Sequence, residues 1–351
     1  MLLLSRQNIT MSFPYSLKPF NTFGVEQSCL SLIEVHSKAE LQSTCLSLYQ
    51  SKRPMLVLGG GSNIVFTDDF NGTVVRVLTK GISCSEDDTH FYLAVEAGEN
   101  WHELVQFSLN QNMPGLENLA LIPGTVGAAP IQNIGAYGVE LCDICDWVEY
   151  LELESGNLLR LTVDECEFAY RESIFKGSLR DKAVITAVGL RLPKAWQPKL
   201  AYGPLQSFTA ETVTPREIFD RVCEVRSEKL PNPEVLGNAG SFFKNPIVSA
   251  ATYMQLATRF PSIVGYAQPN GEVKLAAGWL IEHAGLKGFA LGNAGVHAKQ
   301  ALVLVNLGHA TGQDICRLAL HVITRVNEVF GVKLEAEPRI MGLTGETSLD
   351  V

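Results

Sequence analysis

Residues 122–138 read Ile-Pro-Gly-Thr-Val-Gly-Ala-Ala-Pro-Ile-Gln-Asn-Ile-Gly-Ala-Tyr-Gly, a glycine-rich run without a charged side chain. Such a composition makes a poor regular helix and indicates backbone that wraps around something. Glycine lets successive amides point into one concavity and lets the chain approach a ligand closely, which suits a diphosphate. We therefore expect this stretch to line a cofactor site.

A second glycine loop precedes it in the chain. Residues 58–63 read Leu-Gly-Gly-Gly-Ser-Asn and lie between β-branched runs at 55–58 and 73–77, a pattern typical of strand, turn and strand. Taken alone, a triple glycine is more often a simple tight turn than a ligand site. Beside the longer run, it becomes a candidate for the same cofactor.

The rest of the chain mixes helix-like and strand-like patterns without an internal repeat. At 351 residues it exceeds the usual size of a single core, so we expect two or three domains. Two prolines and several charges break the pattern at 226–236 and mark a boundary. We expect helices at 38–50, 101–110, 251–259, 276–284 and 314–330, and strands at 92–95, 147–153, 158–161, 183–192 and 301–306.

Charge and hydropathy exclude several classes of protein. The formal net charge is −9, and no cluster of Lys and Arg offers an electrostatic footprint for nucleic acid. No apolar run reaches membrane-spanning length, and the apolar residues 1–4 are too few for a signal-peptide core. We therefore expect a cytoplasmic protein without membrane insertion, and we treat Met11 as an alternative start to Met1.

The cysteines and histidines give no sign of a metal site. The eight cysteines are scattered, which predicts reduced thiols and no disulfide framework. Cys142 and Cys145 have C-x-x-C spacing, but no second Cys or His pair stands at ligand spacing, so we expect small buried side chains. The histidines form no H-E-x-x-H pair. We expect no bound metal.

Two common enzyme patterns are missing. The fingerprint G-x-G-x-x-G between a strand and a helix is not present, which disfavours a Rossmann dehydrogenase. No nucleophile elbow or Ser-His-Asp pattern surrounds Ser241, which disfavours a hydrolase.

Three further segments bear residues suited to chemistry. Arg171 lies among aromatic residues in 168–176, Ser241 follows a glycine turn in 237–246, and Glu337 directly precedes a proline. Taken singly, these are equally compatible with a surface ion pair, a turn hydroxyl and a solvated acid.

Read together and in this order, the segments closely resemble the UDP-N-acetylenolpyruvoylglucosamine reductases, and the resemblance runs from about Asn21 to Arg339. It implies an α+β protein: a two-lobed FAD-binding module of the vanillyl-alcohol-oxidase (PCMH) type plus a C-terminal α/β substrate domain. The implied division is 14–79 for FAD-binding lobe 1, 80–229 for lobe 2, 230–335 for the substrate-binding domain and 336–351 for a C-terminal segment that returns to the active site.

The resemblance also implies the site. Arg171, Ser241 and Glu337 match the catalytic residues, and FAD is expected to be non-covalent because the glycine loops hold no histidine for covalent attachment. The expected substrate contacts are Tyr202, Lys229, Asn245, Tyr266 and Gln300. The expected FAD contacts are Gly59, Gly60, Gly61, Ser62, Asn63, Pro123, Gly124, Thr125, Gly127, Ala128, Gln132, Asn133, Gly135, Tyr137 and Gly138.

The reaction implied by the resemblance explains these residue types. NADPH reduces the flavin and leaves, and UDP-N-acetylglucosamine enolpyruvate takes its place. Hydride addition to the enolpyruvyl ether develops enediolate-like charge, which suits the Arg171 guanidinium, and Ser241 matches the proton donor. A charged Glu337 would repel the substrate carboxylate, so we expect either a raised pKa for this residue or a position held by Arg171.

Two alternatives remain open at this point. A related flavin enzyme that oxidises an alcohol or sugar would react with oxygen or a quinone and would not need NADPH. A sugar-nucleotide-binding protein that has lost catalysis would need no proton donor, and the joint presence of Arg171, Ser241 and Glu337 argues against it. We expect a monomer.

Overall fold

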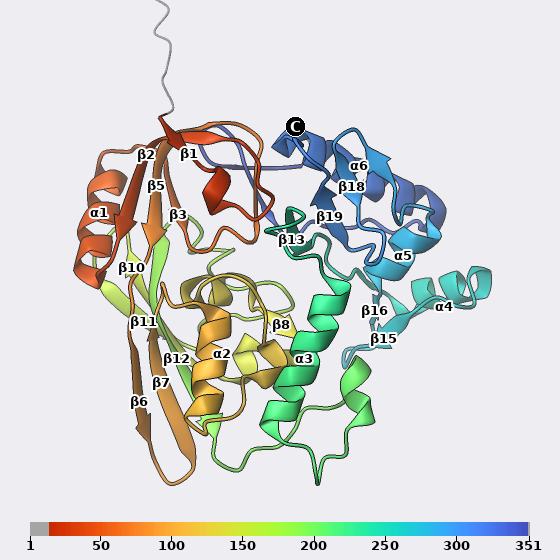
Figure 1. Cartoon of the computed structure of the whole chain (residues 1–351), viewed down its shortest axis with the longest axis horizontal. Helices are drawn as coiled ribbons and strands as arrows, with labels where there is room; N and C mark the ends of the chain where they lie inside the picture. Colours follow the sequence, from red (N-terminus) through yellow and green to blue (C-terminus); the bar gives the residue numbers. More distant parts are fainter. Residues whose placement is uncertain (1–13, 350–351) are drawn as a thin grey trace, which may run out of the picture.

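The computed structural model describes residues 14–349; Met1, Met11 and the last two residues of the predicted C-terminal segment lie outside this range. Helices and sheets are both present throughout, which confirms the α+β expectation. Figure 1 shows the first sheet and its helix beside a second, larger sheet, with the C-terminal part of the chain forming a separate body around α6.

The first sheet has four strands in the order β1-β2-β5-β3, and the β2–β5 and β5–β3 pairs are parallel. Helix α1 supplies the crossover between β2 and β3, and its Leu41 and Cys45 pack against Val35 and Val75 of the sheet. Ser37 and Glu40 form a capping box that fixes where the helix begins. The elements are β1 (Tyr15–Ser16), β2 (Ser28–Val35), α1 (Lys38–Gln50), β3 (Met55–Leu58) and β5 (Phe70–Val77).

The second sheet is antiparallel, in the order β11-β10-β12-β7-β6. One of its faces and helices α2 and α3 share a core that contains Trp101, Leu104, Val188, Ile218 and Val222. The elements are β6 (Ile82–Glu86), β7 (His90–Glu96), α2 (Trp101–Asn110), β10 (Cys145–Glu152), β11 (Leu158–Thr162), β12 (Ala183–Pro193) and α3 (Pro215–Lys229).

The glycine-rich stretch crosses this second body without an α-helix, as its composition predicted. It contains the 3₁₀ segment η3 (Val126–Gln132) and β8 (Gly135–Ala136), which forms a small hairpin with β9 (Val139–Glu140) directly after the stretch. Further 3₁₀ turns are η1 (Lys18–Phe20), η2 (Glu117–Leu119), η4 (Leu141–Asp143) and η5 (Gly203–Ser207).

The third body combines two small sheets with three helices. Its four-stranded sheet has the order β13-β19-β18-β17, and its three-stranded sheet the order β14-β16-β15. Helix α6 packs its apolar side on the first of these, with Ile315, Leu318 and Val322 fully buried. The elements are β13 (Asn238–Ser241), β14 (Ile247–Val248), α4 (Ala250–Arg259), β15 (Gly265–Ala267), β16 (Val273–Leu275), α5 (Ala277–His283), β17 (Ala290–Leu291), β18 (Ala294–Val296), β19 (Val303–Asn306) and α6 (Gly312–Phe330).

The end of the chain returns to its beginning. Strand β20 (Arg339–Met341) pairs in parallel with β4 (Ile64–Phe66), and in antiparallel with β21 (Glu346–Thr347). Because β4 directly follows the loop 58–63, this pairing sets residues 337–339 beside the first glycine loop. The predicted division at 79, 229 and 335 stays a proposal, to which these sheet boundaries lend support.

One helix was not expected. Helix α3 begins at the Thr214 cap, with Pro215 at its first turn and Glu217 completing a capping box. It runs to Lys229, so the boundary that the sequence placed at 226–236 begins inside its last turn.

Candidate active site

A cavity of about 1820 Å³ lies between the three bodies and is lined by both glycine loops, by Arg171, by Ser241 and by Glu337. Pockets for one small ligand usually measure roughly 300–1,000 Å³. The cavity therefore has room for a cofactor and a second molecule together.

The two glycine loops pack directly on each other. A Cβ at Gly59 would lie 2.3 Å from the Thr125 hydroxyl oxygen, and one at Gly60 would lie 3.0 Å from Cα of Gly124. Gly61 has φ +62°, and a Cβ there would lie 1.9 Å from the Phe20 carbonyl oxygen. Gly61 tolerates no side chain, and Gly59 and Gly60 leave little room for one, so the loops approach closely and form a surface of the kind that admits a dinucleotide such as FAD.

Every expected cofactor contact except Asn133 lines the cavity. Asn133 is fully buried, with φ +43°. Its Nδ2 donates to Glu140 Oε2 over 2.9 Å and to the Ala169 carbonyl over 3.2 Å, and its Oδ1 accepts from the Cys142 amide over 3.0 Å. The expectation that this side chain faces the cofactor is therefore corrected: Asn133 holds the loop together from behind. The expected contacts that do line the cavity are Gly59, Gly60, Gly61, Ser62, Asn63, Pro123, Gly124, Thr125, Gly127, Ala128, Gln132, Gly135, Tyr137 and Gly138.

Asn63 connects the glycine loops to the C-terminal segment. Its Nδ2 donates to Gln132 Oε1 over 2.8 Å and to the Glu337 carbonyl over 3.3 Å. The Asn63 carbonyl accepts from the Arg339 amide over 3.1 Å. One asparagine thus fixes three segments that are far apart in sequence.

Arg171 sits at the tip of a tight turn. Ala169 and Glu172 exchange backbone hydrogen bonds of 3.1 Å, and Arg171 takes the left-handed conformation with φ +60°. Its guanidinium donates from Nη2 to the Gly135 carbonyl over 3.0 Å and from Nε to Glu337 Oε1 over 3.1 Å. Such a conformation is strained for a residue with a side chain and is often found at functional sites.

Glu337 is the buried acid of the site, with a side chain only 10% exposed. Burial raises the pKa of its carboxyl above the ordinary value, and the Arg171 guanidinium opposes the rise. Both features expected for this residue, a raised pKa and a position held by Arg171, are therefore present.

Ser241 ends strand β13, opposite Val303 of β19. The next residue, Phe242, accepts a hydrogen bond from the Glu337 amide over 2.9 Å. Ser241 and Glu337 consequently belong to neighbouring extended segments on one wall of the cavity. The three predicted catalytic residues are brought together from three parts of the chain.

The expected substrate contacts also line the cavity. Tyr202 precedes η5 and forms an aromatic row with Tyr137 and Tyr266, with ring centroids 6.2 and 6.3 Å apart. Asn245 accepts from the Ala277 amide over 2.9 Å at the first turn of α5. The expected contacts on the lining are Tyr202, Lys229, Asn245, Tyr266 and Gln300.

Among the charged or polar residues on the lining that sequence reasoning missed are Tyr170, Glu140, Arg226 and Lys274. Arg226 lies three positions before Lys229 on α3, so the two cations share one helix face. Its Nε has no hydrogen-bond partner although it is buried, and burial lowers the pKa of this guanidinium. Recognising α3 from its capping box would have paired Arg226 with Lys229.

Among residues 14–349 no cluster of His, Cys, Asp and Glu has the arrangement of a metal site, and no helix is long and apolar enough to span a membrane. All eight cysteines are free thiols. The described lining of the cavity contains neither histidine nor cysteine.

Comparisons with known proteins agree with this geometry. Residues 30–162 match the model of an FAD binding domain, and residues 232–341 match that of the UDP-N-acetylenolpyruvoylglucosamine reductase C-terminal domain. The chain is 98% identical over 341 residues to the UDP-N-acetylenolpyruvoylglucosamine reductase of Shewanella sp. (strain ANA-3), covering 97% of this chain and 100% of that one. It is 51% identical over 334 residues to the reductase of Escherichia coli O157:H7, covering 95% and 98%.

A solved structure supports the same assignment. The crystal structure of UDP-N-acetylenolpyruvylglucosamine reductase from Thermus caldophilus aligns with a TM-score of 0.63 at 25% identity, covering 94% of this chain and 99% of that chain. These similarities set aside the oxidase and the catalytically inactive binding protein as alternatives. The chain belongs to the UDP-N-acetylenolpyruvoylglucosamine reductase family.

Proposed function

We propose that Arg171, Ser241 and Glu337 are the catalytic residues of this chain. The protein is an FAD-dependent oxidoreductase that uses NADPH to reduce UDP-N-acetylglucosamine enolpyruvate to UDP-N-acetylmuramate in peptidoglycan precursor synthesis. The observation that carries the assignment is the meeting of Arg171 and Glu337 over 3.1 Å on the wall that also bears Ser241.

FAD is held by the two glycine loops. Gly59 and Gly60 carry no side chain where they meet Thr125 and Gly124, which lets backbone amides reach a diphosphate. The chemistry that bound FAD would supply at these loops is hydride transfer from NADPH to the enolpyruvyl double bond. Stabilising the developing charge and delivering the proton are the tasks of the protein's own side chains.

Arg171 is proposed to stabilise the charge that develops on the substrate carboxylate. Its bonds to Gly135 and Glu337 fix the plane of the guanidinium, and a guanidinium has further donors for a bidentate contact with a carboxylate. A donor that is already oriented does not need to reorganise as the charge forms.

Ser241 is proposed to deliver the proton that completes the reduction. A hydroxyl is a weak acid, so it can serve only a strongly basic intermediate over a short, fixed distance. Glu337 is proposed to stand next to this intermediate, where burial raises its pKa and so favours the neutral form more than in an exposed carboxyl. A neutral carboxyl neither repels the substrate carboxylate nor competes with it for Arg171.

Lys229 and Arg226 are proposed to bind the diphosphate of the sugar nucleotide. Both line the cavity from the last turn of α3, and the buried Nε of Arg226 has no protein partner. A buried cation without a partner is costly unless a ligand supplies the opposite charge. Tyr202, Tyr266, Asn245 and Gln300 are proposed to complete the pocket.

The location and assembly of the enzyme are further proposals. We expect it to work in the cytoplasm, where NADPH and nucleotide sugars are available, and to work as a monomer. The second expectation is supported by the catalytic and substrate residues all being supplied by one chain.

Ser241→Ala tests the catalytic assignment. Visible absorbance follows flavin reduction by NADPH and its return when the enolpyruvyl substrate is added. We expect bleaching at the wild-type rate and a return that is slower by roughly 10²–10⁴-fold, the usual contribution of a positioned acid. A return at the wild-type rate would remove Ser241 from the mechanism.

A further inference from the structure

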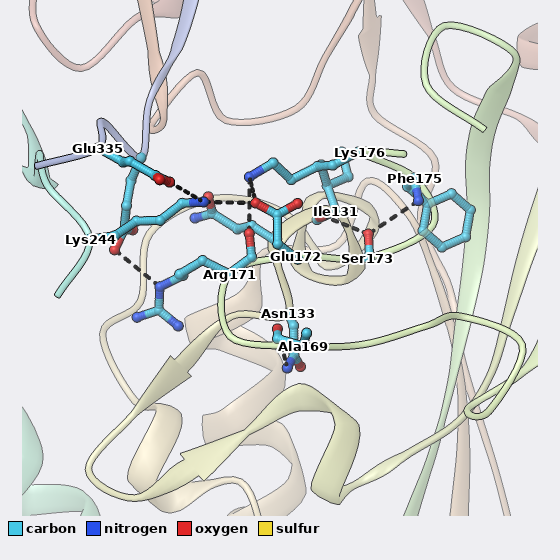
Figure 2. A network of polar contacts seen from close by, with 12 residues as sticks. Ile131, Asn133, Ala169, Arg171, Glu172, Ser173, Phe175, Lys176, Lys244 and Glu335 are labelled. Carbon is cyan, nitrogen blue, oxygen red and sulfur yellow. Dashed lines mark hydrogen bonds and ion pairs between the residues drawn. The ribbon is translucent and has the colours of Figure 1, made fainter. Parts of the chain in front are cut away.

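Four charged side chains alternate in a row directly beside Arg171 (Figure 2). Glu172 Oε1 accepts from Lys244 Nζ over 2.7 Å and from Lys176 Nζ over 3.1 Å, and Lys244 Nζ also lies 3.4 Å from Glu335 Oε2. Lys176 in addition donates to the Arg171 carbonyl over 2.9 Å. We call Glu172, Lys176, Lys244 and Glu335 the charged row.

Each of three members of the row is a near neighbour in sequence of a catalytic residue. Glu172 directly follows Arg171, Lys244 comes three positions after Ser241, and Glu335 comes two positions before Glu337. Lys244 therefore joins two segments, those of Arg171 and Glu337, to its own segment, which carries Ser241.

Backbone contacts strengthen the link between Lys244 and the segment of Glu337, whereas side chains alone link Lys244 to the segment of Arg171. The Lys244 amide donates to the Glu335 carbonyl over 2.9 Å, and Phe243 and Ala336 form an antiparallel bridge. The segment of Arg171 is tied to Lys244 by the Glu172 carboxylate. An additional contact is the Tyr170 hydroxyl, which accepts from the Asn245 amide over 3.2 Å.

The ion pair of Lys244 and Glu172 is partly shielded from water on the lysine side. The Lys244 side chain is only 14% exposed and Glu172 is 47% exposed. Although burial disfavours the ammonium, its contacts with Glu172 raise the pKa of Lys244, so it stays charged. An ammonium that is largely buried and contacts more than one carboxylate is better oriented than the cation of an isolated surface pair.

We propose that Lys244 is a positioning residue, which aligns Arg171 with Ser241 and Glu337 through its ion pairs with Glu172 and Glu335. Glu172, Lys244 and Glu335 are not among the described residues that line the cavity, so their influence on the reaction passes through their neighbours. This inference rests on the roles proposed above for Arg171, Ser241 and Glu337.

Lys244→Met removes the ammonium and keeps much of the stem, and Lys244→Arg keeps the charge. Flavin absorbance in a stopped-flow instrument separates reduction by NADPH from reoxidation by UDP-N-acetylglucosamine enolpyruvate. We expect Lys244→Met to slow reoxidation on the order of tenfold or more and to leave reduction unchanged, because only reoxidation develops charge opposite Arg171. Lys244→Arg should recover most of the rate.

Lys287→Met is the matched control. Lys287 pairs with Glu282 over 2.9 Å in the same part of the chain, is 32% exposed and does not line the cavity. Calorimetric titration with UDP-N-acetylmuramate adds a readout without turnover, and Lys244→Met should bind this product on the order of tenfold more weakly than the control does.

A double-mutant cycle with Glu172→Gln asks whether the pair acts as a unit. If it does, Lys244→Met/Glu172→Gln should be no slower in reoxidation than Lys244→Met alone. Three outcomes would each overturn the proposal. The slowing of reoxidation in the double variant could equal the product of the slowing in the two single variants, or Lys244→Met could be as fast as the Lys287→Met control. The third outcome is equal slowing of flavin reduction and flavin reoxidation by Lys244→Met.

Two single variants keep the test decisive. If Lys244→Met does not fold, the single variant Glu172→Gln replaces it, because this half-exposed carboxylate ties the Arg171 segment to Lys244; unchanged reoxidation in that variant would overturn the proposal. Arg171→Lys separates a failure of the catalytic role proposed for Arg171 from a failure of the positioning role proposed for Lys244. Fast reoxidation in Arg171→Lys would reject the proposed role of Arg171 itself, whereas slow reoxidation there with normal Lys244→Met would reject only the positioning role.

Discussion

Arg171 donates from Nε to Oε1 of Glu337 over 3.1 Å, although 166 positions separate the two residues in the chain. The contact is possible because β20 pairs with β4 and so returns Glu337 to the first glycine loop. It brings a fixed cation and a buried acid to one point of the cavity wall.

Arg171→Lys should lower kcat by roughly 10²–10³-fold, the loss expected when a fixed donor to developing charge is removed. A lysine ammonium cannot reproduce both the bond to Gly135 and the bond to Glu337 in one plane. FAD content should stay unchanged, because the residue acts on substrate. Steady-state kinetics and the flavin spectrum of the same preparation test this, and a variant with wild-type kcat would contradict it.

Glu337→Gln should change the pH profile of the enzyme. Burial raises the pKa of Glu337 above 4.5, so its carboxyl is neutral below that raised pKa and becomes charged as pH rises through it. The charged form repels the substrate carboxylate, and kcat/KM of the wild type should therefore fall across this interval. Glutamine does not titrate, so the variant should be slower but should lack this decline. Superimposable profiles would exclude the role.

Arg226→Met should raise KM for the sugar nucleotide on the order of tenfold or more, with a smaller effect on kcat, because it removes a cation proposed to bind the diphosphate. The ligand-free variant should be at least as stable as the wild type, since a buried guanidinium with an unpartnered Nε is lost.

Arg221→Met is the control for this helix. Arg221 also lies on α3, but it is more exposed and pairs with Glu224. Thermal unfolding and KM together decide the case: if Arg226→Met lowers stability and leaves KM unchanged, Arg226 has a structural role only.

Local patterns in the sequence were sufficient for much of the fold. The helices expected at 38–50 and 101–110 have those bounds in the structure, because each combines apolar spacing with a capping residue just before it. The glycine loops were recognised because the long run at 122–138 combines glycines with uncharged polar residues, and the shorter loop at 58–63 became a candidate beside it. Helix α3 was not predicted, because the prolines and charges at its end indicated a boundary and the capping signal at Thr214 was not recognised.

Contacts between distant segments could not be predicted from residue types. The family resemblance implied that residues 336–351 return to the active site, but nothing in the sequence indicates that they do so by pairing of β20 with β4, or that Lys244 meets Glu172. Asn133 shows the converse error: its polar side chain in a glycine loop suggested a ligand contact, yet the backbone turns it inward to Glu140 and Ala169. A side chain's direction depends on its φ, which composition does not reveal.

Gly60→Ala should weaken FAD binding without unfolding the protein. Its φ is not in the left-handed region, and the new Cβ would lie 3.0 Å from Cα of Gly124, so the two loops must separate by a few tenths of an ångström. Because both loops are proposed to contact the same cofactor, we expect the Kd of FAD to rise on the order of tenfold.

Gly177→Ala is the matched control for this change, since its nearest contact would be 3.6 Å and its φ is also unrestricted. The ratio of FAD to protein is measured in the supernatant after heat denaturation, which should release all the flavin, because the described cavity lining offers no histidine or cysteine for a covalent bond. Flavin that stays with the precipitated chain would contradict non-covalent binding. Equal FAD content and Kd in the two alanine variants would show instead that the contact between the glycine loops does not determine cofactor affinity.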